Sequence, residues 1–196
     1  MRLLHTETLK LHEFFRADIP PYAILSHTWG EDELFFQEMQ SVNGKSKAGY
    51  DKIRRCCEMA AADGFEYCWV DTCCIDKTSS AELSEAINSM YRWYRVADVC
   101  YVYLADVPPN LGTEGARQAF RKSRWFTRGW TLQELIAPRS MIFFNNDWVE
   151  IRTNGSLKSQ ISEITKIKEE VLEDADSLSK IDGPPYYKYP PKYKAI

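Results

Sequence analysis

Glu134 is the carboxylate in this sequence whose surroundings are best suited to chemistry. It stands in the segment Arg128–Leu135 (RGWTLQEL), where an indole, a guanidinium and an amide lie within two helical turns of it. A carboxylate among such groups is a candidate for a functional role. A glutamate on a short helix is also commonly a solvent-exposed residue, so the spacing alone leaves both interpretations open.

Further polar side chains follow apolar runs that are typical of buried strands. Ser26–Gly30 (SHTWG) follows one such run, Asp71–Lys77 (DTCCIDK) follows a second, and Asp106 follows a third. Parallel strands end at the same edge of a sheet, and ligands bind at that edge in α/β folds. We therefore expect these three places to open on one edge and to hold the site.

Neither a metal site nor a phosphate-binding loop is indicated. The six cysteines show no zinc-knuckle spacing, and the three histidines, His5, His12 and His27, are all far upstream. The Gly-x-Gly-x-x-Gly, Walker and Gly-x-Ser-x-Gly patterns are absent, which argues against hydride transfer, ATP chemistry and serine hydrolysis. A thiol nucleophile, Cys73 or Cys74 paired with His27, stays open beside the favoured interpretation of packed loop cysteines.

The composition is that of a globular chain with little net charge. Its 196 residues include 28 acidic and 25 basic side chains, and a net charge of −3 gives no general basic field for nucleic acid. No apolar run approaches the roughly 20 residues that span a membrane, and the N-terminus lacks a signal-peptide core. Adjacent cysteines are poor disulfide partners, so we expect a reduced, cytoplasmic setting with no nucleic-acid partner and no membrane span.

Short apolar runs alternate with helical periodicity along the chain. We expect a strand over 22–25, a helix over 50–63, a strand over 65–71, a helix over 79–96, a strand over 99–104, short helices over 116–123 and 131–136, and a strand over 140–144. This alternation predicts an α/β fold with a doubly wound, mainly parallel sheet flanked by helices.

The helix over 79–96 carries two local signals. Ser79 and Glu82 have the spacing of a capping box. The core-facing stripe of this helix is predicted to consist of Leu83, Ala86, Ile87, Met90 and Tyr94.

The C-terminal part differs in character from the rest. Apolar positions from Leu157 to Val171 keep helical spacing on an acidic helix, and residues 182–191 form a Pro/Tyr/Lys-rich segment. Such a segment is expected to be extended or disordered. We therefore divide the chain into a domain over 1–155 and a C-terminal helix and tail over 156–196.

Four blocks resemble the fungal heterokaryon-incompatibility (HET) domain. They are YAILSHTWG over 22–30, YCWVDTCCIDK over 67–77, INSMYRWY over 87–94 and RGWTLQEL over 128–135. The resemblance covers about 22–148 and implies a domain whose activation triggers cell death between incompatible fungal strains. In larger relatives it precedes nucleotide-binding (NACHT-type) and repeat modules, so this chain is expected to be a fragment or a reduced stand-alone form.

The HET domain is in turn similar to the TIR domain, and the resemblance therefore implies a TIR-like, flavodoxin-like sheet. Plant TIR domains carry a Trp-Cys-x-x-Glu-Leu motif, which Trp130–Leu135 (WTLQEL) resembles with Thr131 in place of the cysteine. The glutamate of that motif cleaves NAD, so the resemblance assigns catalysis to Glu134. NAD is then a substrate, and neither a cofactor nor a metal is expected.

One carboxylate is chemically sufficient for this reaction, because nicotinamide leaves NAD as a neutral molecule and needs no proton. Glu134 would stabilise the oxocarbenium-like ribosyl centre or hold its hydroxyls. Stacking, donor and acceptor chemistry suggests further substrate-binding residues. These are Trp29, Trp93 or Trp130 for stacking on nicotinamide or adenine, Arg128 for the pyrophosphate, His27 or Asp71 for ribose hydroxyls, and Ser26 beside them.

Each of these assignments has a structural alternative. The tryptophans can simply pack in the core, which we accept for Trp69, and Arg128 can form a salt bridge. Two functions from different classes follow: an NAD-cleaving effector that acts on self-assembly, and a non-enzymatic death-signalling module that works by homotypic or heterotypic assembly. Both imply self-association, with a NACHT-type or other incompatibility protein as a further partner.

Overall fold

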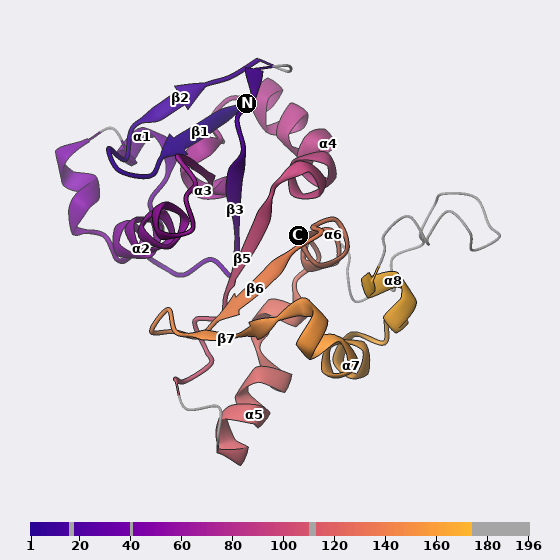
Figure 1. Ribbon diagram of the computed structural model, residues 1–196. Coiled ribbons are helices and arrows are strands. Elements are labelled where there is room, and N and C mark those ends of the chain that lie inside the picture. Colours follow the sequence, from indigo (N-terminus) through magenta and orange to yellow (C-terminus); the bar gives the residue numbers. More distant parts are fainter. Residues whose placement is uncertain (16–17, 40, 110–112, 174–196) are drawn as a thin grey trace.

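Seven strands form one sheet in the computed structural model, which describes residues 1–15, 18–39, 41–109 and 113–173. The strands are β1 (Arg2–His5), β2 (Leu11–Glu13), β3 (Tyr22–His27), β4 (Tyr67–Trp69), β5 (Val99–Tyr103), β6 (Met141–Phe144) and β7 (Glu150–Thr153). The helices are α1 (Phe36–Met39), η2 (Val42–Ser46), α2 (Ala48–Ala62), α3 (Asp71–Cys74), α4 (Ser80–Val96), α5 (Glu114–Lys122), η3 (Arg124–Thr127), α6 (Thr131–Ile136), α7 (Asn154–Thr165) and α8 (Glu169–Glu173), where η marks a 3-10 helix. Across the sheet the strand order is β2-β1-β4-β3-β5-β6-β7 (Figure 1).

Strands β3 to β6 form a parallel core, as the alternation of strands and helices predicted. β3 pairs in parallel with β4 and with β5, and β5 pairs in parallel with β6. All residues of β3 are buried, as expected for a strand that is covered on both faces. The α/β class and the helices flanking the sheet are therefore confirmed.

Antiparallel strands extend both edges of this core, which the sequence analysis did not anticipate. β1 pairs with β2 and β4, and β7 pairs with β6, all in the antiparallel sense. The sheet is therefore mixed. β1 and β2 are short and carry half-exposed or exposed polar residues such as Arg2 and His12, so no apolar run marks them in the sequence.

Helices cover the two faces of the sheet in turn. Trp69 of β4 packs against α4, whereas Tyr101 of β5 donates a hydrogen bond to Asp63 at the end of α2. These two rings lie on opposite faces, because they pair with the consecutive residues Ile24 and Leu25. The connection from β3 to β4 thus runs over one face and that from β4 to β5 over the other. The ends of β3 and β5 form the switch point at which such sheets bind ligands.

The helix α4 differs from its prediction in two details. Ala86 and Tyr94 of the expected stripe are buried as predicted, but Ile87 is 43% exposed and Trp93, which lay outside the stripe, is buried. The Ser79 hydroxyl accepts from the Glu82 backbone N–H, as a capping box requires. The Glu82 carboxylate does not complete the box; it accepts from the backbone N–H of Asp76 instead.

The acidic helix expected near the C-terminus is divided into α7 and α8. Lys166 follows α7 in the left-handed conformation, with φ of 64°, which ends the helix there. Leu157 and Ile161 of α7 belong to the main core. The segment 182–191, predicted to be extended or disordered, lies outside the described residues.

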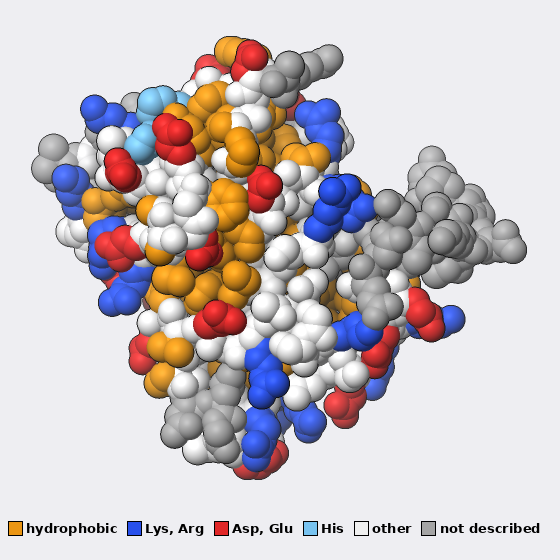
Figure 2. All heavy atoms as spheres, viewed as in Figure 1, with side chains coloured by type: hydrophobic (Ala, Val, Ile, Leu, Met, Phe, Trp, Pro, Cys, Tyr) orange, Lys and Arg blue, Asp and Glu red, His pale blue; other side chains and the backbone are white. Residues whose placement is uncertain are grey.

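The surface combines charges of both signs with isolated apolar groups. Figure 2 shows apolar side chains gathered over the middle of one face, with Lys, Arg, Asp and Glu side chains scattered around them. Large apolar side chains that remain exposed include Trp29, Ile87 and Tyr91. Within the part of the chain that the structure describes, no helix is both long and apolar enough to cross a membrane.

Candidate active site

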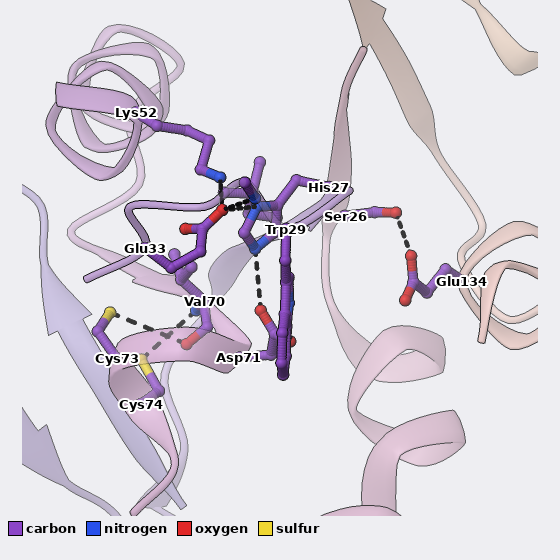
Figure 3. Close-up of polar contacts among 12 residues, drawn as sticks. Ser26, His27, Trp29, Glu33, Lys52, Val70, Asp71, Cys73, Cys74 and Glu134 are labelled. Atoms are coloured by element: carbon purple, nitrogen blue, oxygen red, sulfur yellow. Dashed lines mark hydrogen bonds and ion pairs between the residues drawn. The ribbon is translucent and has the colours of Figure 1, made fainter. Parts of the chain in front are cut away.

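Two groups of polar residues lie on opposite sides of the end of β3. Consecutive side chains of a strand point to opposite faces, so Ser26 and His27 must diverge. Figure 3 shows Ser26 directed toward Glu134 of α6, and His27 directed toward Asp71 at the start of α3. We call the first group, Ser26, Trp125, Arg128 and Glu134, the Glu134 cluster. The second, His27, Trp29, Glu33, Lys52, Asp71 and Lys77, is the His27 cluster.

Glu134 is buried, with only 5% of its surface exposed, and both of its carboxylate oxygens are occupied. The Ser26 hydroxyl donates to Oε2 over 2.5 Å, although the two residues are 108 positions apart in the chain. Arg128 donates from Nη1 to Oε2 over 3.0 Å and from Nη2 to Oε1 over 3.1 Å. This bidentate pair is the strong form of an arginine–carboxylate interaction.

Trp125 completes the Glu134 cluster, and sequence reasoning missed it. Its indole N–H donates to the Ser26 hydroxyl over 2.7 Å, so this hydroxyl both accepts and donates. The ring is fully buried in η3, and its backbone carbonyl accepts a hydrogen bond from the Thr131 hydroxyl. Nothing in the local sequence distinguishes this tryptophan from one that only packs. The cluster thereby ties η3 and α6 to the end of β3.

Arg128 links the two clusters electrostatically. Burial lowers the pKa of its guanidinium, but the charges of Glu134 and Asp71 outweigh burial and raise that pKa overall. Arg128 in turn helps to lower the pKa of Asp71. The salt bridge weighed in the sequence analysis as an alternative for Arg128 is present in the structure.

Asp71 is the centre of the His27 cluster. His27 donates from Nε2 to Oδ1 over 2.9 Å, and the Trp29 indole donates to Oδ2 over 2.9 Å. The Lys77 ammonium lies 3.9 Å from Oδ2. Burial by itself raises the pKa of Asp71, but the hydrogen bond from His27 and the charges of His27, Lys77 and Arg128 lower it well below its ordinary value. Asp71 is therefore an ionised acceptor.

The second side of the His27 ring faces Glu33 and Lys52, which the sequence analysis did not single out. The Glu33 carboxylate accepts from Lys52 and, over 2.6 Å, from the backbone N–H of Gly30. Its Oε1 lies 3.9 Å from His27 Nδ1. Burial and the charge of Lys52 lower the pKa of His27, although the hydrogen bond with Asp71 and the charges of Asp71 and Glu33 oppose this shift. Within the described part of the chain, neither His27 Nδ1 nor Glu33 Oε2 has a hydrogen-bond partner.

The other expected site residues have separate places. Trp29 is 44% exposed beside Asp71, and Trp130 is half-buried at the start of α6. Trp93 is 8% exposed and packs on Trp69, with ring centroids 5.4 Å apart. Asp106 was expected at the site edge, but it accepts from the Ser123 hydroxyl and the Arg124 backbone N–H. Its hydrogen bonds fix the junction of α5 and η3, and those within the described residues involve neither cluster.

The cysteines are buried and carry no sign of activation. Cys73 donates weakly to the Val70 carbonyl over 3.9 Å, and the Val70 backbone N–H contacts Cys74 over 3.4 Å. A hydrogen bond with Cys74 and burial raise the pKa of Cys73 well above its ordinary value. A nucleophilic thiol needs the opposite shift, so this environment does not favour Cys73 as a nucleophile. Within the described residues, no group of three potential ligands could hold a metal ion.

Glu134 lines neither of two hollows on the described surface. One of about 690 Å³ lies between the β1–β2 hairpin and the region around η2, bounded by residues such as Leu9 and Tyr50. The other, of about 240 Å³, lies between α2 and the β6–β7 turn and includes Lys52 and Trp148. With 5% of its surface exposed and both oxygens paired with Ser26 and Arg128, the Glu134 carboxylate is enclosed by its own partners in this conformation.

Comparisons with known proteins identify the domain. Residues 22–118 match the family described as heterokaryon incompatibility protein (HET). The chain is 52% identical over 160 residues to the vegetative incompatibility protein HET-E-1 of Podospora anserina, an alignment that covers 79% of this chain and 12% of that protein. No solved structure matches. Both comparisons support one assignment: residues 22–118 carry a domain of the heterokaryon incompatibility (HET) family.

Proposed function

We propose that this chain is a fungal cell-death effector domain that cleaves NAD to nicotinamide and ADP-ribose, or to a cyclic product, with Glu134 as the catalytic carboxylate. The observation that carries the proposal is the contact between Glu134 and Ser26. It brings the WTLQEL segment against the SHTWG segment at the carboxyl end of β3, the edge where α/β sheets bind ligands. The similarity to a vegetative incompatibility protein supports the cell-death role.

The strand order supports a TIR-like architecture for the domain. Numbered in chain order, the parallel strands β3 to β6 lie in the order 2-1-3-4 across the sheet. Doubly wound sheets of the flavodoxin type have this order. Fold likeness alone does not establish activity, so the proposal depends on the site.

In the proposed reaction the bond between C1′ of the ribose and the nicotinamide nitrogen breaks. Its electron pair stays on the nitrogen, which neutralises the pyridinium, and Glu134 stabilises the oxocarbenium-like ribosyl centre. A water then adds to C1′ and loses a proton, or a hydroxyl of the same ADP-ribose adds to give a cyclic product. For the reaction to occur, Arg128 must release the Glu134 carboxylate and bind the pyrophosphate of NAD, its proposed partner in the substrate complex.

Other residues serve the substrate around this centre. Trp29, partly exposed, and Trp130 are the proposed stacking residues, while Asp71 or His27 binds ribose hydroxyls. Trp93 belongs to the core and is left out of this assignment. Self-association in the cytoplasm, alone or with a NACHT-type incompatibility protein, is proposed to displace Arg128 and open the site.

The test is nicotinamide release by concentrated, purified protein. Glu134→Gln keeps the side-chain volume and an acceptor for Ser26, and should reduce release by about 100-fold or more. Glu150→Gln, an exposed position in β7, is the matched control and should leave release unchanged. Equal release by wild type and Glu134→Gln, with matching circular dichroism, would contradict the proposal.

A non-enzymatic assembly module is the second candidate, and one observation favours it. Both oxygens of Glu134 are already paired, so the carboxylate can act purely as a tie between α6 and β3. In that case no nicotinamide is released at any protein concentration. A folded Glu134→Gln variant would then still kill cells when expressed in the fungus.

A further inference from the structure

Lys77 ends in a cage made by two aromatic rings. Its ammonium lies 3.6 Å from the centroid of the Trp29 ring and 5.3 Å from that of Phe35. The two rings meet edge to face, with centroids 6.2 Å apart and planes at 81°. Ring faces carry partial negative charge, so this arrangement attracts cations.

A carboxylate forms the remaining wall of this cage. Asp71 Oδ2 lies 3.9 Å from the Lys77 ammonium and is fixed by the indole N–H of Trp29. Within the described residues, the Lys77 nitrogen is buried without a hydrogen-bond partner. Burial lowers the pKa of Lys77, and the nearby Asp71 and Glu33 only partly oppose this. The ammonium is thus held by ring faces and charge, without the hydrogen bonds that it would have in water.

Two rings and a carboxylate are the groups by which proteins bind organic cations. We propose that Trp29, Phe35 and Asp71 form a binding site for a flat organic cation of the pyridinium class, and that Lys77 fills this site when no ligand is bound. The inference rests on the proposed function for the identity of the cation, because the nicotinamide ring of NAD carries a positive charge. It does not require that Glu134 be catalytic.

The position of the cage fits this occupant. Trp29 belongs to the segment that follows β3 and is 44% exposed, so a ring from solvent can reach it. Ser26, which bonds to Glu134, and His27, which bonds to Asp71, are consecutive residues of β3, so the cage and the Glu134 cluster lie at the same strand end. Once displaced, Lys77 adds a cation for a pyrophosphate. Cleavage turns the charged ring into neutral nicotinamide, which removes the attraction and favours product release.

Binding of 1-methylnicotinamide, measured by isothermal titration calorimetry, tests the inference. This compound has the charged ring but no ribosyl bond to break, so the outcome does not depend on catalysis. Lys77→Met removes the competing charge at similar length and should bind roughly tenfold or more tightly than wild type. Neutral nicotinamide should bind weakly to both proteins. Lys122→Met, at the exposed end of α5, is the matched control and should behave as wild type.

The gain in affinity must depend on the cage. Adding Trp29→Leu or Asp71→Asn to Lys77→Met should abolish it. Equal affinity of wild type and Lys77→Met, or a gain that survives loss of Trp29, would overturn the inference. Lys77→Gln gives the same test if Lys77→Met lowers the melting temperature.

A further variant separates this inference from the proposed function. Glu134→Gln in the Lys77→Met background should still bind 1-methylnicotinamide. Binding without any NAD cleavage by the parent protein would contradict only the proposed function. Cleavage without enhanced binding by Lys77→Met would contradict only the cation site.

Discussion

The two clusters at the end of β3 differ in how completely their polar atoms are paired. In the Glu134 cluster, both carboxylate oxygens, the Ser26 hydroxyl and the Trp125 indole all have partners. In the His27 cluster, atoms of His27, Glu33 and Lys77 are buried without one, and these are three of the four such side-chain atoms in the described chain. Buried polar atoms are normally paired, so unpaired ones call for a functional explanation. The comparison indicates that the Glu134 cluster stabilises this conformation, whereas the His27 cluster has capacity left for a ligand.

The largest expected effect is on stability in the Glu134 cluster. Glu134→Ala removes the buried partner of Arg128, which is itself only partly exposed, and should lower the free energy of unfolding by about 3 kcal/mol. Adding Arg128→Met should restore most of that loss, because neither charge then remains. Urea unfolding of the two variants measures both changes. An unchanged midpoint for Glu134→Ala would show that the pair does not hold this conformation.

A smaller effect should come from the hydrogen bonds that reach Ser26. Ser26→Ala and Trp125→Phe each remove one partner and should each cost about 1–2 kcal/mol. Because the two side chains form one chain of hydrogen bonds, their double-mutant cycle should give a coupling of about 1 kcal/mol. Additive losses would mean that Trp125 contributes only packing.

The free energy of unfolding should depend on pH through His27. The pKa of His27 is lowered in the folded state, so the unfolded chain binds more protons as the pH falls below the ordinary value of 6.5. Stability should therefore decrease as the pH falls through that range. His27→Gln should weaken this dependence in urea unfolding at several pH values, whereas His12→Gln should retain it. An identical pH dependence in wild type and His27→Gln would show that His27 does not cause the pH dependence of stability.

The smallest stability effect is expected at Lys77. Lys77→Met gives up the attraction to Trp29 and Asp71, but it also removes an ammonium that is buried without hydrogen bonds. These changes oppose each other, and the free energy of unfolding should move by less than about 1 kcal/mol. Thermal unfolding measures the difference. If Lys77→Met lowered the free energy of unfolding as much as Glu134→Ala, both clusters would be primarily structural.

The parallel core was predictable because its signals are local. The apolar run that forms β3 and the periodicity of α2 and α4 follow from burial, and Gly64 takes the positive φ, 88°, expected after a helix. The antiparallel edges were not predictable. The buried apolar residues of β1 are only Leu3 and Leu4, and a run of two is too short to indicate a strand in the sequence.

The site was predictable in its location but not in its contacts. Strand ends indicated where Ser26, His27 and Asp71 would lie, because that edge follows from topology. The partners Trp125, Glu33 and Lys52 depend on how distant segments pack, and their local sequence carries no signal for it. Arg128 illustrates the limit, since both a salt bridge and a phosphate contact suit its side chain.

The divergence of Ser26 and His27 makes the length of β3 more critical than its composition. If one residue were inserted into or deleted from 22–25, Ser26 would point toward α3 and His27 would point toward α6. Both polar clusters would be lost together, even if every apolar position were refilled. Shortening or lengthening this segment by two residues would preserve the parity of the faces and shift both groups along the strand. Variants with one residue inserted into or deleted from the segment 22–25 would therefore disable both clusters at once, without substituting any residue in them.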